Sequence, residues 1–256
     1  DDGEKTFLGH TGNFNGEDII DIIIQQPATE RFISRHLYNF FVADELQVPS
    51  WTNEPPKNPE AIKILCKALR ESDFDMRSVL RTLFNSDFFK EARFAKVKSP
   101  AELVVSTYRL VGNQNFLKPE FAKRASVPTL LGQELQNPPS VEGWHTGQEW
   151  INSGSLMARI NFVADLISDT SLPGVQSIIN RVRSKGEQSP EELVDSCLDL
   201  LGPLEDLEPQ THQDLLEQAS EAGTVRWGTE DEVKASTQRV AELLQLIVSA
   251  KEYQFG

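Results

Sequence analysis

The sequence has 256 residues, of which 39% are hydrophobic and 25% are charged. This composition is typical of a globular protein and excludes a disordered chain. No apolar run approaches the roughly 20 residues of a membrane helix, and the longest one, residues 19–24, is interrupted by Asp21. We therefore expect no membrane span and a core of one domain or one and a half.

The formal net charge of −14 is unevenly distributed. Residues 185–256 hold 16 acidic and 5 basic side chains, whereas residues 1–184 are close to neutral. An acidic surface disfavours nucleic acid and anionic membranes, because both require a basic face. One basic cluster lies among phenylalanines and is interpreted as the solvated exterior of a helix rather than a phosphate site. Its members are Lys90, Arg93, Lys96 and Lys98.

From the N-terminus, residues 5–8 alternate as a short strand does, and the glycine-rich turn GHTGNFNG follows. Apolar side chains at helical spacing then form a stripe: Phe32, Ile33, His36, Leu37, Phe40 and Phe41. A histidine on such a stripe is interpreted as a core residue with satisfied hydrogen bonds rather than a ligand. Residues 51–59, WTNEPPKNP, are interpreted as an ordered loop, and a second stripe covers residues 76–84.

Three later helices begin with a capping box, in which Ser or Thr is followed three residues on by Glu. These starts are Ser99, Ser189 and Thr229. The first helix is predicted to end near Gly112 and the second at Gly202. Two more stripes, over residues 156–167 and 233–248, complete the pattern. The prediction is an all-α protein, an irregular bundle of about ten helices.

A polar segment around residues 183–190 precedes the rise in acidic charge. It predicts a main helical domain over residues 1–183 and an acidic helical subdomain over residues 184–256. Cys66 and Cys197 both lie among apolar residues at helical spacing and are interpreted as buried free thiols. A disulfide between them stays open, because the sequence alone does not pair cysteines.

The loop of residues 132–155 is the strongest candidate site. It combines a Pro-Pro pair with Trp144, His145 and Trp150, and loops of this length are often functional. His145 with Glu142 or Glu149 would supply a general acid and base beside an aromatic platform for a glycan-like ligand. Alternatively, both indoles anchor the loop on the helical core, and the His and Glu side chains lie on its rim.

No sequence motif for a metal, a cofactor, a nucleophilic serine or a phosphate loop is present. We therefore expect neither metal nor cofactor. Two carboxylates acting as a hydrolase pair would leave no local motif, so whether the protein is an enzyme stays open.

The segment NPPSVEGWHTGQEWINSGSLMARINF, residues 137–162, resembles the PP-x-V-x-GW…W-[IL]-N-[ST]…L-x-R-x-N pattern of a bacterial family, domain of unknown function 1800. Residues 5–42 resemble the middle of that family, and residues 240–255 resemble its C-terminus. Members usually carry a further N-terminal helical region, so the chain is expected to be roughly the C-terminal half. The residues that match the loop pattern are Pro138, Pro139, Gly143, Trp144, Trp150, Asn152, Arg159 and Asn161.

The resemblance implies an exported protein of the periplasm or cell surface, with a sulfatase-like exported protein as its partner. It assigns no catalytic residues. Two hypotheses follow. In the favoured one, the chain is a helical binding or scaffold protein of the bacterial envelope, with Trp144, Trp150, Asn152, Arg159 and Asn161 as binding residues. In the alternative, it is an enzyme acting on a glycan-like polymer at the Trp144–Trp150 loop.

Overall fold

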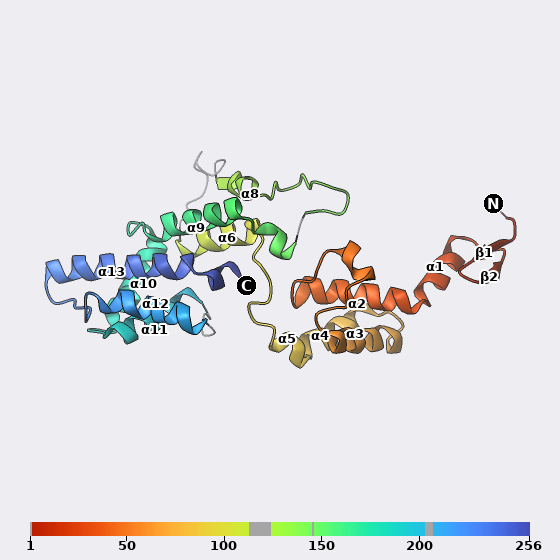
Figure 1. Ribbon diagram of the computed structural model, residues 1–256, viewed down its shortest axis with the longest axis horizontal. Helices are drawn as coiled ribbons and strands as arrows, with labels where there is room; N and C mark the ends of the chain where they lie inside the picture. The colour runs from red at the N-terminus through yellow and green to blue at the C-terminus, as the bar shows by residue number, and fades with distance from the viewer. Residues whose placement is uncertain (1, 113–123, 145, 203–206) are drawn as a thin grey trace. The chain divides into compact units, whose positions relative to one another are not determined.

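The computed structural model describes residues 2–112, 124–144, 146–202 and 207–256. The chain divides into two compact units, Asp1–Lys96 and Val97–Gly256. Within the described ranges there are twelve α-helices, short 3-10 helices and one two-stranded sheet (Figure 1). The prediction of an all-α protein is confirmed.

The first unit begins with an antiparallel hairpin of β1 (Lys5–Phe7) and β2 (His10–Gly12), in which Phe7 pairs with His10. The predicted strand is present, but part of the segment interpreted as a turn is its partner strand. The turn itself is Leu8 and Gly9, both with positive φ, as tight two-residue hairpins require. The remaining elements are α1 (Gly16–Ile24), α2 (Pro27–Phe41), the 3-10 helix η1 (Val48–Thr52), α3 (Pro59–Glu71), α4 (Met76–Asn85) and α5 (Asp87–Lys90).

The core of the first unit lies where α2 packs on α3 and α3 packs on α4. Helix α3 contributes Leu65 and Leu69, and α4 contributes Val79 and Leu83, all without exposed surface. Tyr38 of α2 belongs to the same cluster.

Helix α2 differs from its predicted pattern. The phenylalanines at its predicted core positions are exposed, Phe32 by 50% and Phe40 by 71%. His36 is also exposed, so its interpretation as a core histidine is wrong. The buried face instead carries Arg35 and Glu30, besides Ser34 and Tyr38. Burial of these charges is tolerated because each has a carboxylate or guanidinium partner, which hydrophobic periodicity does not reveal.

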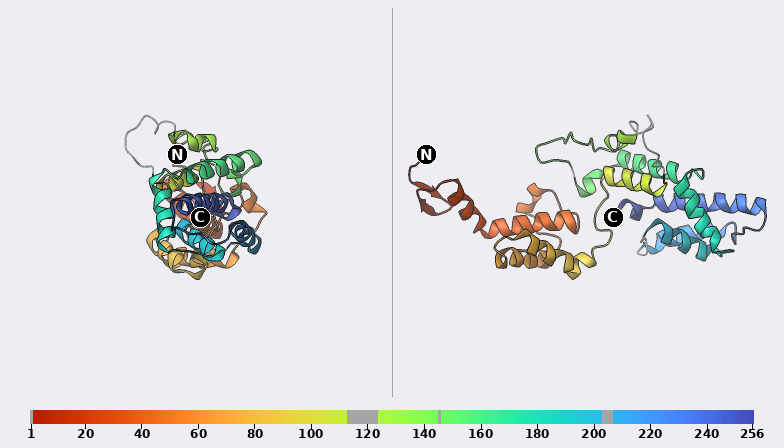
Figure 2. Two further views of the ribbon diagram at one scale, coloured as in Figure 1. Left: turned by 90° about the vertical axis from the view of Figure 1, so that its left-hand side faces the viewer. Right: turned by 180° about the vertical axis from the view of Figure 1, so that it is seen from behind.

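The second unit contains α6 (Pro100–Leu110), α8 (Val127–Leu130), the 3-10 helix η2 (Gly147–Trp150), α9 (Ser153–Ile167), α10 (Pro173–Ser184), α11 (Pro190–Leu201), α12 (Pro209–Ser220), α13 (Glu230–Ser249) and the 3-10 helix η3 (Lys251–Gln254). Helix α13 is the centre of this unit, since it packs against α9, α10, α11 and α12 (Figure 2). Its inner side buries Val240, Leu244 and Ile247.

All three predicted capping boxes are present. The hydroxyl groups of Ser99, Ser189 and Thr229 each accept the backbone N–H three residues on. The glutamates at those positions accept the N–H of the capping residue in return. Helix α11 ends where predicted, at Gly202 with φ of 122°.

The predicted boundary near residue 184 falls inside the second unit, whereas the chain passes from the first compact unit to the second after Lys96. Helices α10 and α11, on either side of the predicted boundary, pack together. Lys185 and Gln188 also donate hydrogen bonds to Ser196 Oγ of α11. The rise in acidic charge after residue 184 is therefore a feature of the surface, and it does not mark a boundary between packed units.

Two further predictions concern individual side chains. Lys96 and Lys98 are not the solvated residues expected of the basic cluster, because both are half-buried and Lys96 pairs with Asp44 at 3.3 Å. Cys66 and Cys197 are buried free thiols. Burial raises the pKa of the Cys197 thiol to about 12.

Among the helices described, none combines the length and apolar character needed to cross a bilayer.

Candidate functional site

The two indoles of the 132–155 loop hold it in place to different degrees. Trp150, at the end of η2, is only 6% exposed. Trp144 is half-buried, and its Nε1–H donates to the carbonyl of Glu134 at 3.0 Å. This bond and a short bridge between Ser140 and Gly143 close the loop on itself. The placement of Trp150 agrees with the alternative in which an indole anchors the loop.

The proposed acid/base groups do not meet in a pocket among the residues that can be described. Glu142 and Glu149 are both exposed. His145 lies outside the described residues. Neither glutamate lines the pocket described below. Among its described residues, the loop therefore supplies packing and surface, and none of its glutamates lines that pocket.

Asn152, Arg159 and Asn161 have three separate positions. Asn152 caps α9, because its Oδ1 accepts the N–H groups of Gly154 and Ser155 at 3.1 and 3.0 Å. Asn161 is exposed on α9. Arg159 has no exposed surface. Of the three, only Arg159 therefore lies in the interior near the C-terminal segment.

Arg159 ties α9 to two distant segments of the second unit. Its Nε donates to Gln254 Oε1 at 2.9 Å, and its Nη2 donates to the carbonyl of Lys98 at 2.7 Å. Desolvation lowers the pKa of this guanidinium to about 10, partly offset by the charge of Glu102. A buried guanidinium held by neutral acceptors is costly, and it fixes the position of both partners.

Lys98 lies close to the same cluster. Its Nζ donates to the carbonyl of Tyr253 at 2.8 Å and sits 4.3 Å from the centre of the Tyr253 ring. Burial lowers the pKa of this ammonium group to about 8, and the nearby Arg159 charge acts in the same direction. The buried Arg159 and the half-buried Lys98 thus both contact the C-terminal 3-10 helix.

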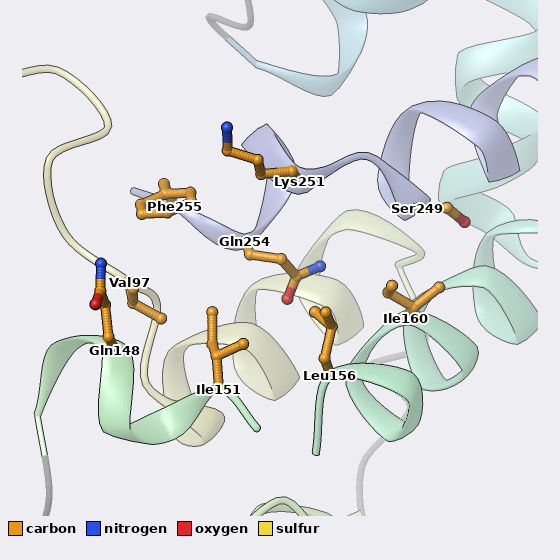
Figure 3. Close-up of a pocket in the computed structure, with 9 residues that line it drawn as sticks. All are labelled: Val97, Gln148, Ile151, Leu156, Ile160, Ser249, Lys251, Gln254 and Phe255. Carbon is orange, nitrogen blue, oxygen red and sulfur yellow. The ribbon is translucent and has the colours of Figure 1, made fainter. Parts of the chain in front are cut away.

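A pocket of about 390 Å³ lies beside this cluster, between the end of the loop and the C-terminal segment (Figure 3). The side chains of Ile151 and Leu156 point from one side toward Gln254 on the other. Phe255 and Val97 extend the apolar lining, and the complete lining adds Gln148, Ile160, Ser249 and Lys251. Arg159 does not line the pocket, but it orients Gln254, which does.

A family model described as "Protein of unknown function (DUF1800)" matches residues 1–255 of the chain. The chain belongs to the DUF1800 family. No curated protein and no solved structure matches it.

The pocket of this DUF1800 chain includes residues that the loop-centred prediction missed. Gln254 and Phe255 come from the C-terminal segment, and Val97 comes from the start of the second unit. A signal for the first two existed, because residues 240–255 form one of the segments that resemble the family. Sequence reasoning had no means of pairing that segment with α9, since the two lie almost 100 residues apart.

Within the described parts of the DUF1800 chain, no group of three or more His, Cys, Asp or Glu side chains is arranged to hold a metal ion. The titratable side chain that lines the pocket is Lys251, whose Nζ lies 2.5 Å from Glu208 Oε1. The lining therefore offers apolar contact and a few hydrogen bonds.

The low pKa of Lys98 predicts a pH-dependent stability. Between about pH 8 and the ordinary lysine value of about 10.4, the folded state binds fewer protons at this site than the unfolded state. Lys98 therefore makes the free energy of unfolding rise with pH in that window, and its penalty is fully present below pH 8. We expect urea unfolding of the wild type between pH 7.5 and 9.5 to show this contribution.

The Cys197 thiol has the opposite effect, because its raised pKa means that the folded state keeps a proton that the unfolded state loses as the pH rises. Its contribution therefore lowers the free energy of unfolding with increasing pH. The measurement is accordingly the difference between wild type and Lys98→Met. The free energy of unfolding of the wild type minus that of Lys98→Met should increase with pH. An unchanged difference across the window would show that the Lys98 ammonium is solvated.

Proposed function

We propose that this protein is a helical binding or scaffold protein whose second unit receives an apolar segment of a partner protein in the pocket between η2, α9 and η3. The observation that carries the proposal is the pocket itself, lined by Ile151, Leu156, Ile160 and Phe255 with few polar groups at its margin. Pockets of this size and lining are suited to holding apolar side chains.

A second observation supports a protein as the partner. The segment from α8 into the loop exposes Leu130, Leu135 and Val141, of which Val141 is fully exposed. Pro138 and Pro139 in the same loop are also exposed. A partner protein that extends along this segment would cover these apolar side chains.

The partner and the compartment of this proposal come from the family resemblance. It supports an exported sulfatase-like protein as the partner and the bacterial periplasm or cell surface as the location. Cell fractionation of the protein in its native host tests the compartment directly. Recovery in the cytoplasmic fraction alone would contradict it.

The alternative, an enzyme acting on a glycan-like polymer at the Trp144–Trp150 loop, has less support. It requires an acid and a base facing one cavity. Glu142 and Glu149 are exposed, and the pocket is lined by neither. The buried position of Trp150 also removes one indole from a stacking platform.

The binding proposal is tested by a charge placed in the pocket. We expect Ile151→Lys to weaken binding of the purified sulfatase-like protein from the same genome by at least about tenfold, because the partner's apolar side chains would then meet an ammonium group. Isothermal titration calorimetry measures this change.

The matched control is Met157→Lys, an exposed position of α9 outside the pocket. This control should bind as the wild type does. Both variants should keep a cooperative thermal transition. Equal affinity of the two variants, or no binding by the wild type, would contradict the proposal.

A further inference from the structure

The first unit contains another pocket, of about 550 Å³, between α2 on one side and η1 with the segment that follows it on the other. Its lining combines the aromatic rings of Phe32 and Trp51 with Arg31, Glu54 and Asn53. This pocket is independent of the second unit and of the binding function proposed for it. It is also where the two unexpected features of α2, an exposed phenylalanine and a buried arginine, occur together.

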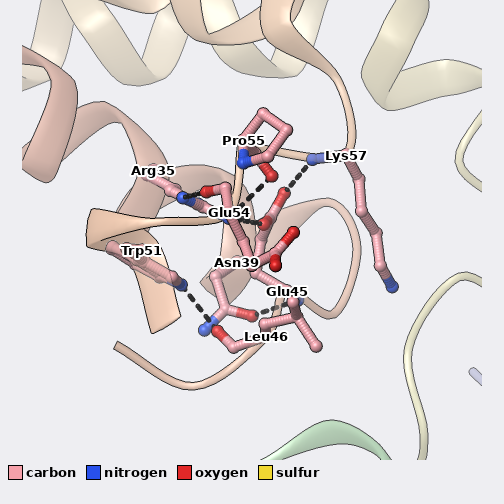
Figure 4. Close-up of polar contacts among 8 residues, drawn as sticks. All are labelled: Arg35, Asn39, Glu45, Leu46, Trp51, Glu54, Pro55 and Lys57. Carbon is pink, nitrogen blue, oxygen red and sulfur yellow. Dashed lines mark hydrogen bonds and ion pairs between the residues drawn. The ribbon is translucent and has the colours of Figure 1, made fainter. Parts of the chain in front are cut away.

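A network of buried polar contacts holds one wall of this pocket (Figure 4). Arg35 donates through Nε and Nη2 to Glu45 Oε2 at 3.0 and 2.7 Å, and through Nη1 to the carbonyl of Glu54 at 2.8 Å. Glu45 Oε1 accepts the N–H of Lys57 at 2.9 Å. The side chains of Arg35 and Glu45 are only 7% and 1% exposed. The segment that follows η1 therefore has a fixed conformation before any ligand binds.

Trp51 is held by the same network. Its Nε1–H donates to the carbonyl of Leu46 at 2.6 Å. The Arg35 guanidinium lies 4.7 Å from the centre of its ring, and the His36 ring lies at the same distance. Partial burial lowers the pKa of His36, which favours its neutral form beside these rings. Trp51 is thus a rigid aromatic surface that costs little to order on binding.

Phe32 adds a second aromatic ring at 5.8 Å from Trp51 and remains half exposed. The charges around the pocket cancel, since Arg35 is paired with Glu45, and Arg31 and Glu54 carry opposite charges. A neutral ligand with both apolar and hydroxyl surfaces complements such a lining better than an ion does. Aromatic faces contact the C–H surface of a ring, while Arg, Asn and Glu side chains exchange hydrogen bonds with hydroxyl groups.

We propose that this pocket is a binding site for a neutral saccharide, which places a sugar ring against Phe32 and Trp51 and its hydroxyl groups toward Arg31, Asn53 and Glu54. All of these residues line the pocket, and all of them belong to the first unit. With this site, the first unit would bind a saccharide, and the second unit would bind the protein partner proposed above. Loss of either activity would leave the other intact.

The test is calorimetric titration of the whole chain with three neutral hexasaccharides, cellohexaose, xylohexaose and chitohexaose. We expect at least one to bind, and Phe32→Ala to weaken that binding by about tenfold through loss of one aromatic contact. The matched control is Phe40→Ala, which removes an exposed phenylalanine of the same helix that does not line the pocket. This control should keep the wild-type affinity.

Polygalacturonate and a proline-rich decapeptide are the competing probes. No binding of any hexasaccharide, equal loss in Phe32→Ala and Phe40→Ala, or binding of only one of the competing probes would overturn the proposal. The Ile151→Lys variant serves as a further control and should bind the saccharide normally. This control separates the present site from the pocket of the second unit.

Discussion

Replacing Trp150 with alanine is expected to lower the free energy of unfolding by about 3–5 kcal/mol. The indole is 6% exposed, so its removal costs transfer free energy and leaves a cavity at the start of α9. The carbonyl of Trp150 accepts the hydroxyl of Ser155 at 2.9 Å, a backbone contact that the substitution leaves in place. Urea denaturation followed by circular dichroism measures the loss.

Trp144→Ala is the matched comparison in the same loop. Its indole is half-buried and makes one hydrogen bond to Glu134, so we expect a smaller loss of about 1–2 kcal/mol. If Trp150→Ala instead unfolds like the wild type but no longer binds its partner, Trp150 contacts a ligand. That result would revive the loop as a site and contradict its role as an anchor.

The sequence predicts the helical elements of this protein well where the signal is local. The capping boxes at Ser99, Ser189 and Thr229 are examples, because a cap depends on residues three positions apart. The end of α11 at Gly202 has the same origin, since positive φ there favours glycine.

Helix α2 shows where periodicity fails. Its apolar residues recur at helical spacing, and the pattern predicts Phe32 and Phe40 as core positions. The structure exposes both and buries Arg35, because Glu45, which lies beyond the end of the helix, neutralises and hydrogen-bonds it. A partner outside the element carries no periodic signal, so the exposed aromatic surface could not be predicted.

The candidate sites differ in the same way. The sequence indicates the 132–155 loop because its tryptophans, prolines and glycines are neighbours. The pocket lining brings Ile151 next to Gln254, and the pairing of Arg159 with Gln254 depends on how α9 packs against α13. Such long-range pairings are set by tertiary packing, which a single sequence does not encode in any local pattern.

The buried pair of Arg35 and Glu45 predicts the second large effect. We expect Glu45→Ala to lower the free energy of unfolding by about 3–5 kcal/mol, because it leaves the guanidinium buried without its counter-charge. It also removes the acceptor of the Lys57 N–H. Urea denaturation followed by circular dichroism is the appropriate measurement.

The control for this loss is Glu60→Ala, which removes the exposed ion pair with Lys63 in the same unit. Both partners of that pair are largely solvated, so only a small loss, below about 1 kcal/mol, is expected from the ion pair and from the position of Glu60 in the first turn of α3. The double variant Arg35→Leu/Glu45→Leu separates charge from packing. It should recover part of the stability lost in Glu45→Ala, because no unpaired charge then remains buried. A loss in Glu45→Ala as small as that in Glu60→Ala would mean that the pair is hydrated, and the rigid wall inferred for the saccharide pocket would then lack its support.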